Sequence, residues 1–209
     1  MLSISPCSDV ALQTLRPLTA EDVDSYRTLR QKVLAIGDGR YFSDSYTREA
    51  QLNERQWREW CTETPEHCIF GTFDKDRLIG VMMITQHGAI QDLTVEWEAI
   101  WLDPHYRKQG IAQRAYEQIQ KWTIEQGYNR VALYIRADNL RSQQIHRKHG
   151  AQYLHTKRAE IWADGSVEDT LCFALNLASA DAKKGDLSIR NHAYHINNVV
   201  KNEATLWVA

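Results

Sequence analysis

The central third of the chain constrains the fold most, because it reads as strand, helix and strand in immediate succession. Residues 94–102, "TVEWEAIWL", alternate in the manner of a strand, and residues 130–137, "RVALYIRA", form a second strand-like run. Between them, residues 109–127 carry apolar side chains at helical spacing and end on Gly127, a typical helix stop. Strands joined by such a helix lie parallel in one sheet, so the pattern predicts one parallel crossover near the middle.

Short helical and strand-like patterns lie on both sides of this unit, at residues 14–34, 48–62, 67–73, 77–86, 139–150 and 151–177. They read, in order, as a strand with a helix, a second helix, two strands joined by hairpin chemistry, a short helix and a closing hairpin. The resulting order, β-α-α-β-β-β-α-β-α-β-β, predicts an α/β fold (an α+β mixed sheet) with helices flanking the sheet.

The length of 209 residues suits one domain with an appendage. We assign residues 1–177 to the domain and residues 178–209 to a C-terminal extension of uncertain structure, because the chain becomes polar and weakly periodic there. The start, "MLSISPCSDV", lacks the basic and apolar regions of a signal peptide, and no apolar run approaches the length of a membrane span. A cytoplasmic protein without membrane contact is expected.

Charge and cysteine content narrow the choice of partners. The net charge of −2 shows no overall basic bias, so nucleic acid is not an expected partner. Cys7, Cys61, Cys68 and Cys172 are scattered and form no CxxC pair. We expect reduced thiols rather than disulfides or zinc ligands, and we predict no metal site.

The turn between the strand at 94–102 and the following helix carries an unusual set of residues. Arg107 and Lys108 stand just before Gly110, at the mouth of the helix. The first N–H groups of a helix and its dipole attract an anion, and a glycine lets the ligand approach closely. These residues predict a phosphate or pyrophosphate site that is not a P-loop, since no second glycine precedes Lys-Ser or Lys-Thr. The alternative is an ordinary strand–helix connection with two basic residues on the surface.

This turn resembles the acyl-CoA-binding motif of the GCN5-related N-acetyltransferase (GNAT) superfamily. The motif is Arg or Gln, two residues, Gly, one residue, then Gly or Ala, and Arg107, Gly110 and Ala112 occupy its positions. The preceding "WLDPHYR" resembles the end of the family's fourth strand. "RPLTAEDVDSYRTLR" resembles its first strand and helix.

A second segment of the resemblance follows about thirty residues later, with Asn139, Ser142 and "HRKHGA" after a strand. Together the similar segments cover residues 15–177. The chain departs from the family pattern at His146, where Tyr is common, and at Ala151, which replaces an aromatic residue.

The resemblance implies a central mixed sheet whose fourth and fifth strands splay apart, with pantetheine lying between them. It implies an acyl-CoA-dependent N-acyltransferase that moves acetyl from acetyl-CoA directly to a primary amine of a small molecule or peptide, with general-base catalysis. The residues implied in cosubstrate binding are Trp101, Leu102, Arg107, Lys108, Gln109, Gly110, Ile111, Ala112, Asn139 and Ser142.

Two carboxylates are candidates for the base that deprotonates the acceptor ammonium. Unbroken alternation along residues 94–102 puts Glu96 and Glu98 on one face, and Trp97 and Trp101 on the other. The family places a catalytic Glu at either position, so both stay open. We favour Glu98, which is nearer the expected splay.

His146 is the third candidate for catalysis. In the family, the residue four before the final glycine of this helix points towards the coenzyme A sulfur, and Gly150 closes the helix here. A neutral imidazole can donate a hydrogen bond to the leaving sulfur, and an imidazolium can also give it a proton. The alternative is that His146 packs beside Ile145.

The acceptor stays open because two features resemble different branches of the family. Ser142 and His146 have a spacing found in amino-acid N-acetyltransferases, whereas the closing hairpin resembles peptide N-terminal acetyltransferases. The loop holding Tyr41, Phe42 and Tyr46 lies where the family builds its acceptor site. Alternatives are a non-catalytic acyl-CoA sensor and an enzyme acting on aminoacyl-tRNA, which would need a basic groove. A homodimer is one oligomeric state that the sequence allows.

Overall fold

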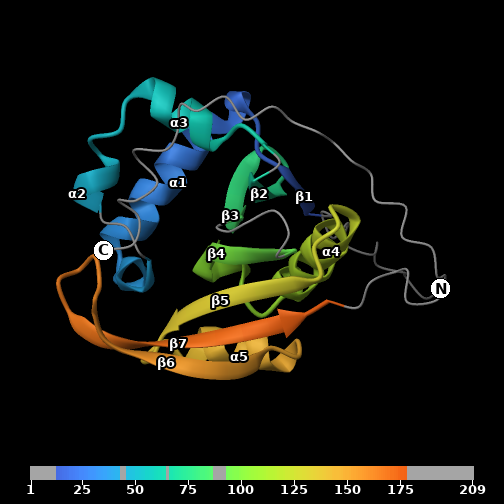
Figure 1. Ribbon diagram of the computed structural model, residues 1–209. Helices are drawn as coiled ribbons and strands as arrows, with labels where there is room; N and C mark the ends of the chain where they lie inside the picture. Colours follow the sequence, from blue (N-terminus) through green and yellow to red (C-terminus); the bar gives the residue numbers. More distant parts are fainter. Residues whose placement is uncertain (1–12, 43–45, 65, 87–92, 178–209) are drawn as a thin grey trace, which may run out of the picture. The chain divides into compact units, whose positions relative to one another are not determined.

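The computed structural model describes residues 13–42, 46–64, 66–86 and 93–177, and the predicted extension at 178–209 lies outside them. These residues form a seven-stranded sheet in the order β1-β2-β3-β4-β5-β7-β6 (Figure 1). Its strands are β1 (Thr14–Pro17), β2 (His67–Asp74), β3 (Arg77–Thr85), β4 (Thr94–Leu102), β5 (Arg130–Arg136), β6 (Gln152–Ile161) and β7 (Val167–Asn176). All neighbours run antiparallel except β4 and β5, which are parallel.

The helices follow the predicted order, except that two short helices replace the single helix predicted over residues 48–62. They are α1 (Val23–Ala35), α2 (Tyr46–Glu49), α3 (Glu54–Trp60), α4 (Ile111–Glu125) and α5 (Leu140–Lys148), with the short 3-10 turns η1 (Ala20–Asp22), η2 (Gly37–Tyr41) and η4 (Pro104–Tyr106). The predicted mixed sheet with a single parallel crossover is therefore confirmed. None of the helices in the described ranges is both long and apolar enough to cross a membrane.

The two faces of the sheet carry separate cores. On one face, α1 and α3 pack through Tyr26, Val33 and Trp57 against side chains of β2 and β3. On the other, α4 packs through Tyr116 and Ile119 against β3, β4 and β5. The buried side chains of α1 and α4 lie on one side of each helix, and burial of these sides against the sheet explains the layered arrangement.

The alternation of side chains along β4 is interrupted halfway along the strand. Glu98 pairs with Met83, but Trp101 pairs with Val81, so β4 has one residue more than β3 over this stretch. The extra residue forms a β-bulge near Ala99, whose φ is +50°. Trp97 therefore joins the core under α4, whereas Trp101 joins the core under α1. The prediction of unbroken alternation was wrong: Trp101 and Glu98 lie on the same side of the sheet.

β4 and β5 pair over a short distance and then separate. Their described ladder consists of Thr94 with Arg130, Val95 with Val131, and Glu96 with Ala132. β4 continues to Leu102 and β5 to Arg136 without further pairs between them among the described residues. This separation agrees with the splay that the family resemblance implies.

The three cysteines within the described ranges, Cys61, Cys68 and Cys172, are free and buried, and Cys7 lies outside those ranges. Burial raises the pKa of Cys61 and Cys68 to about 12, so both thiols are protonated at neutral pH.

A buried ion pair fixes α2 to α1. The guanidinium of Arg30 binds the carboxylate of Glu49, and both side chains are almost fully inaccessible to solvent. Arg30 also lies over the ring of Phe42, 4.8 Å from its centroid. The pair therefore connects α1, α2 and the end of the η2 segment.

We expect replacement of Glu49 alone by Leu to destabilise the fold by about 3–5 kcal/mol, because the buried Arg30 guanidinium loses its carboxylate. The double variant Arg30→Met/Glu49→Leu should regain most of this loss, since both charges are then absent. Urea unfolding of the three proteins measures the difference. A double variant as unstable as the single one would show that the pair itself is not the source of the stability.

Candidate active site

A cavity of about 630 Å³ opens beside the end of β4 and the N-termini of α4 and α5. The predicted site residues in its lining are Trp101, Leu102, Arg107, Lys108, Gly110, Ile111, Ala112, Asn139, Ser142 and His146. Gln109 stands in the same turn, where its side chain donates a hydrogen bond to the carbonyl of His105 at 2.9 Å. The fold thus gathers most of the residues predicted to bind the cosubstrate around one space.

A second, smaller cavity of about 80 Å³ lies where β4 and β5 separate. Residues of both strands line it, among them Glu98, Tyr134 and Arg136. It shares six lining residues with the larger cavity: Tyr41, Phe42, Ile100, Asn139, Ser142 and His146. The two spaces therefore adjoin along a common wall.

The geometry at the N-terminus of α4 would let an anion approach the backbone closely. Lys108 and Gly110 adopt the left-handed conformation, with φ of +63° and +75°. Gly110 is the N-cap of α4, and within the described residues no side chain caps the N–H groups of the first turn. Exposed helix N–H groups, the positive end of the dipole and the absence of a Cβ at position 110 fit a pyrophosphate group.

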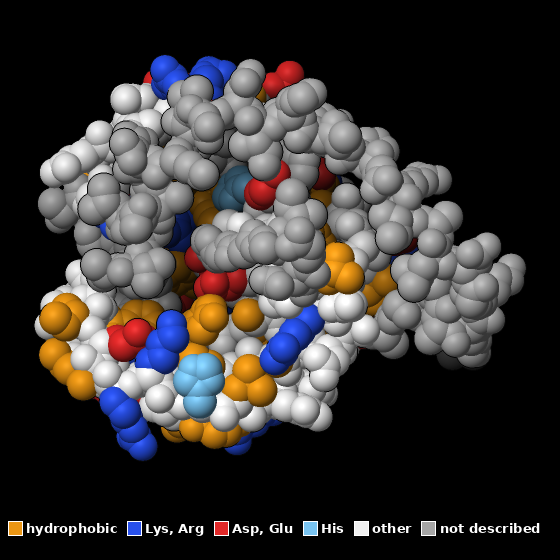
Figure 2. Space-filling view, viewed as in Figure 1, with side chains coloured by type: hydrophobic (Ala, Val, Ile, Leu, Met, Phe, Trp, Pro, Cys, Tyr) orange, Lys and Arg blue, Asp and Glu red, His pale blue; other side chains and the backbone are white. Residues whose placement is uncertain are grey.

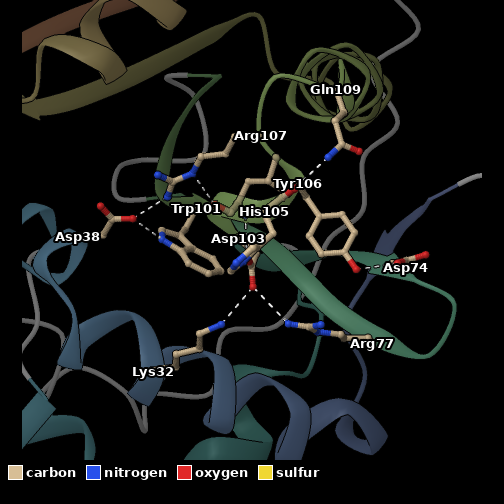
Figure 3. A network of polar contacts seen from close by, with 11 residues as sticks. Lys32, Asp38, Asp74, Arg77, Trp101, Asp103, His105, Tyr106, Arg107 and Gln109 are labelled. Atoms are coloured by element: carbon tan, nitrogen blue, oxygen red, sulfur yellow. Dashed lines mark hydrogen bonds and ion pairs between the residues drawn. The ribbon is translucent and has the colours of Figure 1, made fainter.

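A buried carboxylate holds this turn against the rest of the domain (Figure 3). Asp103 accepts hydrogen bonds from the backbone N–H of His105 at 3.0 Å and from Lys32 Nζ at 3.1 Å, and Arg77 lies 3.4 Å away. Burial by itself would raise the pKa of Asp103, but the hydrogen bonds from His105 and Lys32 hold it at about 2. The hydroxyl of Tyr106 donates to Asp74 at 2.7 Å, a further tie from the turn to β2.

Arg107 does not point freely into the large cavity. Its guanidinium donates to Asp38 Oδ2 at 2.6 Å and to the carbonyl oxygen of Leu102 at 2.8 Å. The indole N–H of Trp101 donates to the same oxygen of Asp38 at 2.9 Å. Because Asp38 balances the charge of Arg107, an anion at this turn would meet chiefly the N–H groups of α4 and the ammonium of Lys108.

Asp38 is not identified as a residue of the site by the sequence. Its η2 segment reads only as part of a polar loop, and the flanking glycines indicate a turn without indicating what the carboxylate binds. Burial would raise the pKa of Asp38, but hydrogen bonds from Arg107 and Trp101 lower it below its usual value.

The two candidate bases occupy different surroundings. Glu98 is half-buried, lines the smaller cavity and accepts a hydrogen bond from the hydroxyl of Thr85 at 2.7 Å. Glu96 lies on the same face nearer Tyr134, whose pKa is raised by burial and then by the negative charge of Glu96. Glu98 is thus the carboxylate that faces the space between the separated strands.

His146 is the most buried of the three candidates for catalysis, with an exposed fraction of 3%. Its Nδ1 lies 3.4 Å from the hydroxyl of Tyr116, and its ring lines both cavities. Burial, together with the nearby His149, lowers the pKa of His146 to about 4. The imidazole is therefore neutral at pH 7, which favours a hydrogen-bond donor over an imidazolium acid.

Asn139 has a structural role at the same wall. Its side-chain oxygen accepts a hydrogen bond from the N–H of Ser142 at 3.1 Å, as an N-cap of α5. The cap orients the helix that carries His146.

Residues 36–151, more than half of the chain, match the family model described as "Acetyltransferase (GNAT) family". The chain belongs to the GNAT acetyltransferase family. It is accordingly an N-acetyltransferase. No curated protein matches the chain.

Solved structures of GNAT enzymes share its fold. An acetyltransferase of the GNAT family from Streptococcus pneumoniae has a TM-score of 0.69 and 13% identity, over 80% of this chain and 100% of that chain. The ribosomal-protein-S18-alanine N-acetyltransferase from Escherichia coli has a TM-score of 0.60 and 16% identity, over 81% and 96%. RimL, a ribosomal L7/L12 α-N-protein acetyltransferase solved in complex with coenzyme A, has a TM-score of 0.66 and 16% identity, over 79% and 94%.

We expect the low pKa of His146 to make the GNAT domain less stable in acid. The unfolded chain takes up a proton near pH 6.5 while the folded protein does so only near pH 4, so stability falls as the pH drops through this window. At pH 5 the loss relative to neutral pH should be on the order of 2 kcal/mol.

Urea unfolding of wild type and His146→Phe at pH 7.5 and pH 5 tests this expectation. The decrease on acidification should be larger in wild type, because the variant lacks the titrating ring while His149 is retained in both. Equal decreases in the two proteins would mean that the folded His146 ring is protonated as readily as in the unfolded chain.

Proposed function

We propose that this GNAT enzyme transfers an acetyl group from acetyl-CoA to a primary amine of a small molecule or peptide, with Glu98 as the general base. One observation carries the proposal: Glu98 and His146 line the same small cavity, which adjoins the larger cavity ending at the uncapped N-terminus of α4. The arrangement provides a binding site for a phosphate-bearing cosubstrate and, next to it, a base and a hydrogen-bond donor.

The large cavity is the proposed cosubstrate site. The N–H groups at the start of α4 and the ammonium of Lys108 hold the pyrophosphate, and the edge of β4 beyond Glu96 offers backbone groups to the pantetheine. When bound, acetyl-CoA supplies an acyl group activated as a thioester. The unpaired edge near Trp101 and Leu102 polarises its carbonyl.

Glu98 takes the proton of the acceptor. An ammonium at neutral pH is not nucleophilic, so a carboxylate beside it must remove one proton before the nitrogen attacks. The contact with Thr85 orients the carboxylate of Glu98 on the side of the sheet that also carries Trp101. Near the centre of the face drawn in Figure 2, acidic side chains lie beside hydrophobic ones, which suits an acceptor that is cationic before it reacts.

His146 assists the departure of the thiolate as a neutral hydrogen-bond donor. Its ring is buried at the wall between the two cavities, and Tyr116 stands 3.4 Å from Nδ1. A donor held in a water-poor site stabilises the negative charge that develops on sulfur without itself changing protonation state.

The acceptor class is open between small amines and peptide N-termini. The S18-alanine and L7/L12 enzymes are similar structures whose names give protein N-termini as acceptors, which favours testing peptides first. Thiol release from acetyl-CoA, screened against amino acids, polyamines, aminoglycosides and peptide N-termini, tests the proposal. Thiol release that does not depend on any added amine would favour plain hydrolysis of acetyl-CoA. The absence of thiol release with every amine tested would favour an acyl-CoA sensor.

The first prediction from the proposed function concerns the anion site. Ala112→Asp places a carboxylate in the first turn of α4, where it interacts favourably with the helix dipole by about 0.3–1 kcal/mol but repels a pyrophosphate. We expect the melting temperature to hold or rise while the Kd for coenzyme A, measured by calorimetry, increases about tenfold or more. Gln118→Asp, on the exposed middle of the same helix, is the matched control and should leave the Kd unchanged. An unchanged Kd in Ala112→Asp would place the pyrophosphate elsewhere.

The second prediction concerns the base. Glu98→Gln should lower kcat by roughly 10²–10⁴-fold, the range for lost general-base catalysis. The deficit should shrink at high pH, where the amine is already neutral. Glu96→Gln should cost less at every pH, since Glu96 is not among the described residues lining the small cavity. A larger loss in Glu96→Gln, or a pH-independent deficit in Glu98→Gln, would overturn the assignment of Glu98 as the base.

A further inference from the structure

We propose that η2 acts as a strap across the gap between β4 and β5 and thereby limits the length of the acyl group that the enzyme accepts. The strap is residues 37–41, and Phe42 follows it directly. This inference rests on the proposed function, because it concerns the acyl end of the same cosubstrate site.

The strap is tied to the end of both separated strands. On the β4 side, Asp38 binds the indole N–H of Trp101 and the guanidinium of Arg107 through one carboxylate oxygen. On the β5 side, the guanidinium of Arg40 pairs with Asp138, and the carbonyl of Arg40 accepts a hydrogen bond from Arg136 at 3.1 Å. Asp38 and Arg40, which lie two residues apart in one short turn, therefore contact opposite sides of the gap.

The attachment on the β5 side involves a buried arginine with several acidic partners. Arg136 is the last residue of β5 and only 3% exposed. Besides the strap carbonyl it binds Asp164 at 3.0 Å and lies 3.1 Å from Asp138. Because Asp164 belongs to the connection between β6 and β7, the strap is joined through Arg136 to the closing hairpin.

At a third point, the backbone of the strap lies directly against the end of α1. A Cβ added at Gly39 would lie 2.5 Å from the carbonyl oxygen of Leu34 and 2.8 Å from its Cα, closer than real Cβ contacts. The N–H of Gly39 donates to the carbonyl of Ile36 at 2.9 Å. Only glycine allows this approach, so the strap is fixed at its middle as well as at both sides.

What the strap holds in place is the wall between the two cavities. Tyr41 and Phe42 line both spaces, and each ring has a guanidinium over it: Arg40 at 5.2 Å from Tyr41 and Arg30 at 4.8 Å from Phe42. Removing the Arg40 side chain would take away the ion pair with Asp138 and the contact with the Tyr41 ring, and so loosen this wall on its β5 side.

The space behind the wall is small, and large side chains line it on the core side. A volume of about 80 Å³ must admit both the acyl group and the attacking nitrogen, next to Glu98. Leu133 and Ile135 of β5 and Trp97 of β4 close the cavity on the side away from the strap, and all three belong to the core. Because these core side chains are closely packed, under this proposal the strap side of the cavity is the boundary that limits the length of the acyl chain.

The test compares acetyl-, butyryl-, hexanoyl- and octanoyl-CoA by calorimetric Kd and by thiol release. Wild type should prefer the shortest chains. Arg40→Ala should raise the relative affinity and kcat/KM for octanoyl-CoA against acetyl-CoA by roughly tenfold, the smaller end of what apolar fit contributes to discrimination. Tyr41→Ala, which removes part of the wall directly and leaves the ion pair, should shift the same ratio in the same direction.

Two further variants separate the strap from a general loss of structure. Arg40→Lys keeps a cation opposite Asp138 and should restore most of the wild-type ratio. Arg55→Ala removes an exposed ion pair with Glu59 on α3 and should leave the ratio unchanged.

The outcomes are distinguishable. The strap proposal would be overturned if wild type bound octanoyl-CoA and acetyl-CoA with equal affinity. It would also be overturned if the ratio of octanoyl-CoA to acetyl-CoA were unchanged in both Arg40→Ala and Tyr41→Ala. An enzyme that turns over no acyl-CoA, but whose binding ratio shifts in Arg40→Ala, would sink the proposed acetyl transfer and still support the strap.

Discussion

The separation of β4 from β5 after Glu96 is the constraint on which the rest of the structure depends. Parallel strands that stopped pairing inside a core would leave polar backbone groups without partners, so the gap needs a ligand or solvent to occupy it. Here the gap opens into both cavities. The bulge at Ala99 adds to this, because it turns Trp101 towards α1 and leaves Glu98 beside the gap.

Holding two strand ends apart requires fixed supports, and carboxylates supply them: Asp103 is buried, whereas Asp38, Asp138 and Asp164 are more exposed. Asp103 anchors the turn after β4 to α1, Asp38 ties the same turn to the strap, and Asp138 and Asp164 hold Arg136 at the end of β5. Each of these acids faces a cation, so each carboxylate takes part in a contact that holds the fold. Glu98 accepts a hydrogen bond from the neutral hydroxyl of Thr85 and lines the small cavity.

Local signals were enough for much of this fold and part of its site. Helical stripes, the hairpin residues and Gly127 placed the elements, and Gly110 with Ala112 placed the mouth of α4. Period-two alternation failed at Ala99, because a one-residue insertion relative to the neighbouring strand leaves no mark in the pattern of a single strand. The low pKa of His146 was equally out of reach, since it comes from burial against Tyr116 and from His149.

The sequence by itself determined the order of elements, the single parallel crossover and the acyl-CoA motif, because these depend on side-chain periods and on residues close together in the chain. Only the tertiary structure decided which glutamate lines the small cavity, which acid pairs with Arg107 and which residues span the gap between β4 and β5. Asp38 and Arg107, like Arg40 and Arg136, are far apart in the chain and meet only after the sheet has formed. Contacts of that kind depend on strand register and helix placement, which packing fixes and local sequence does not.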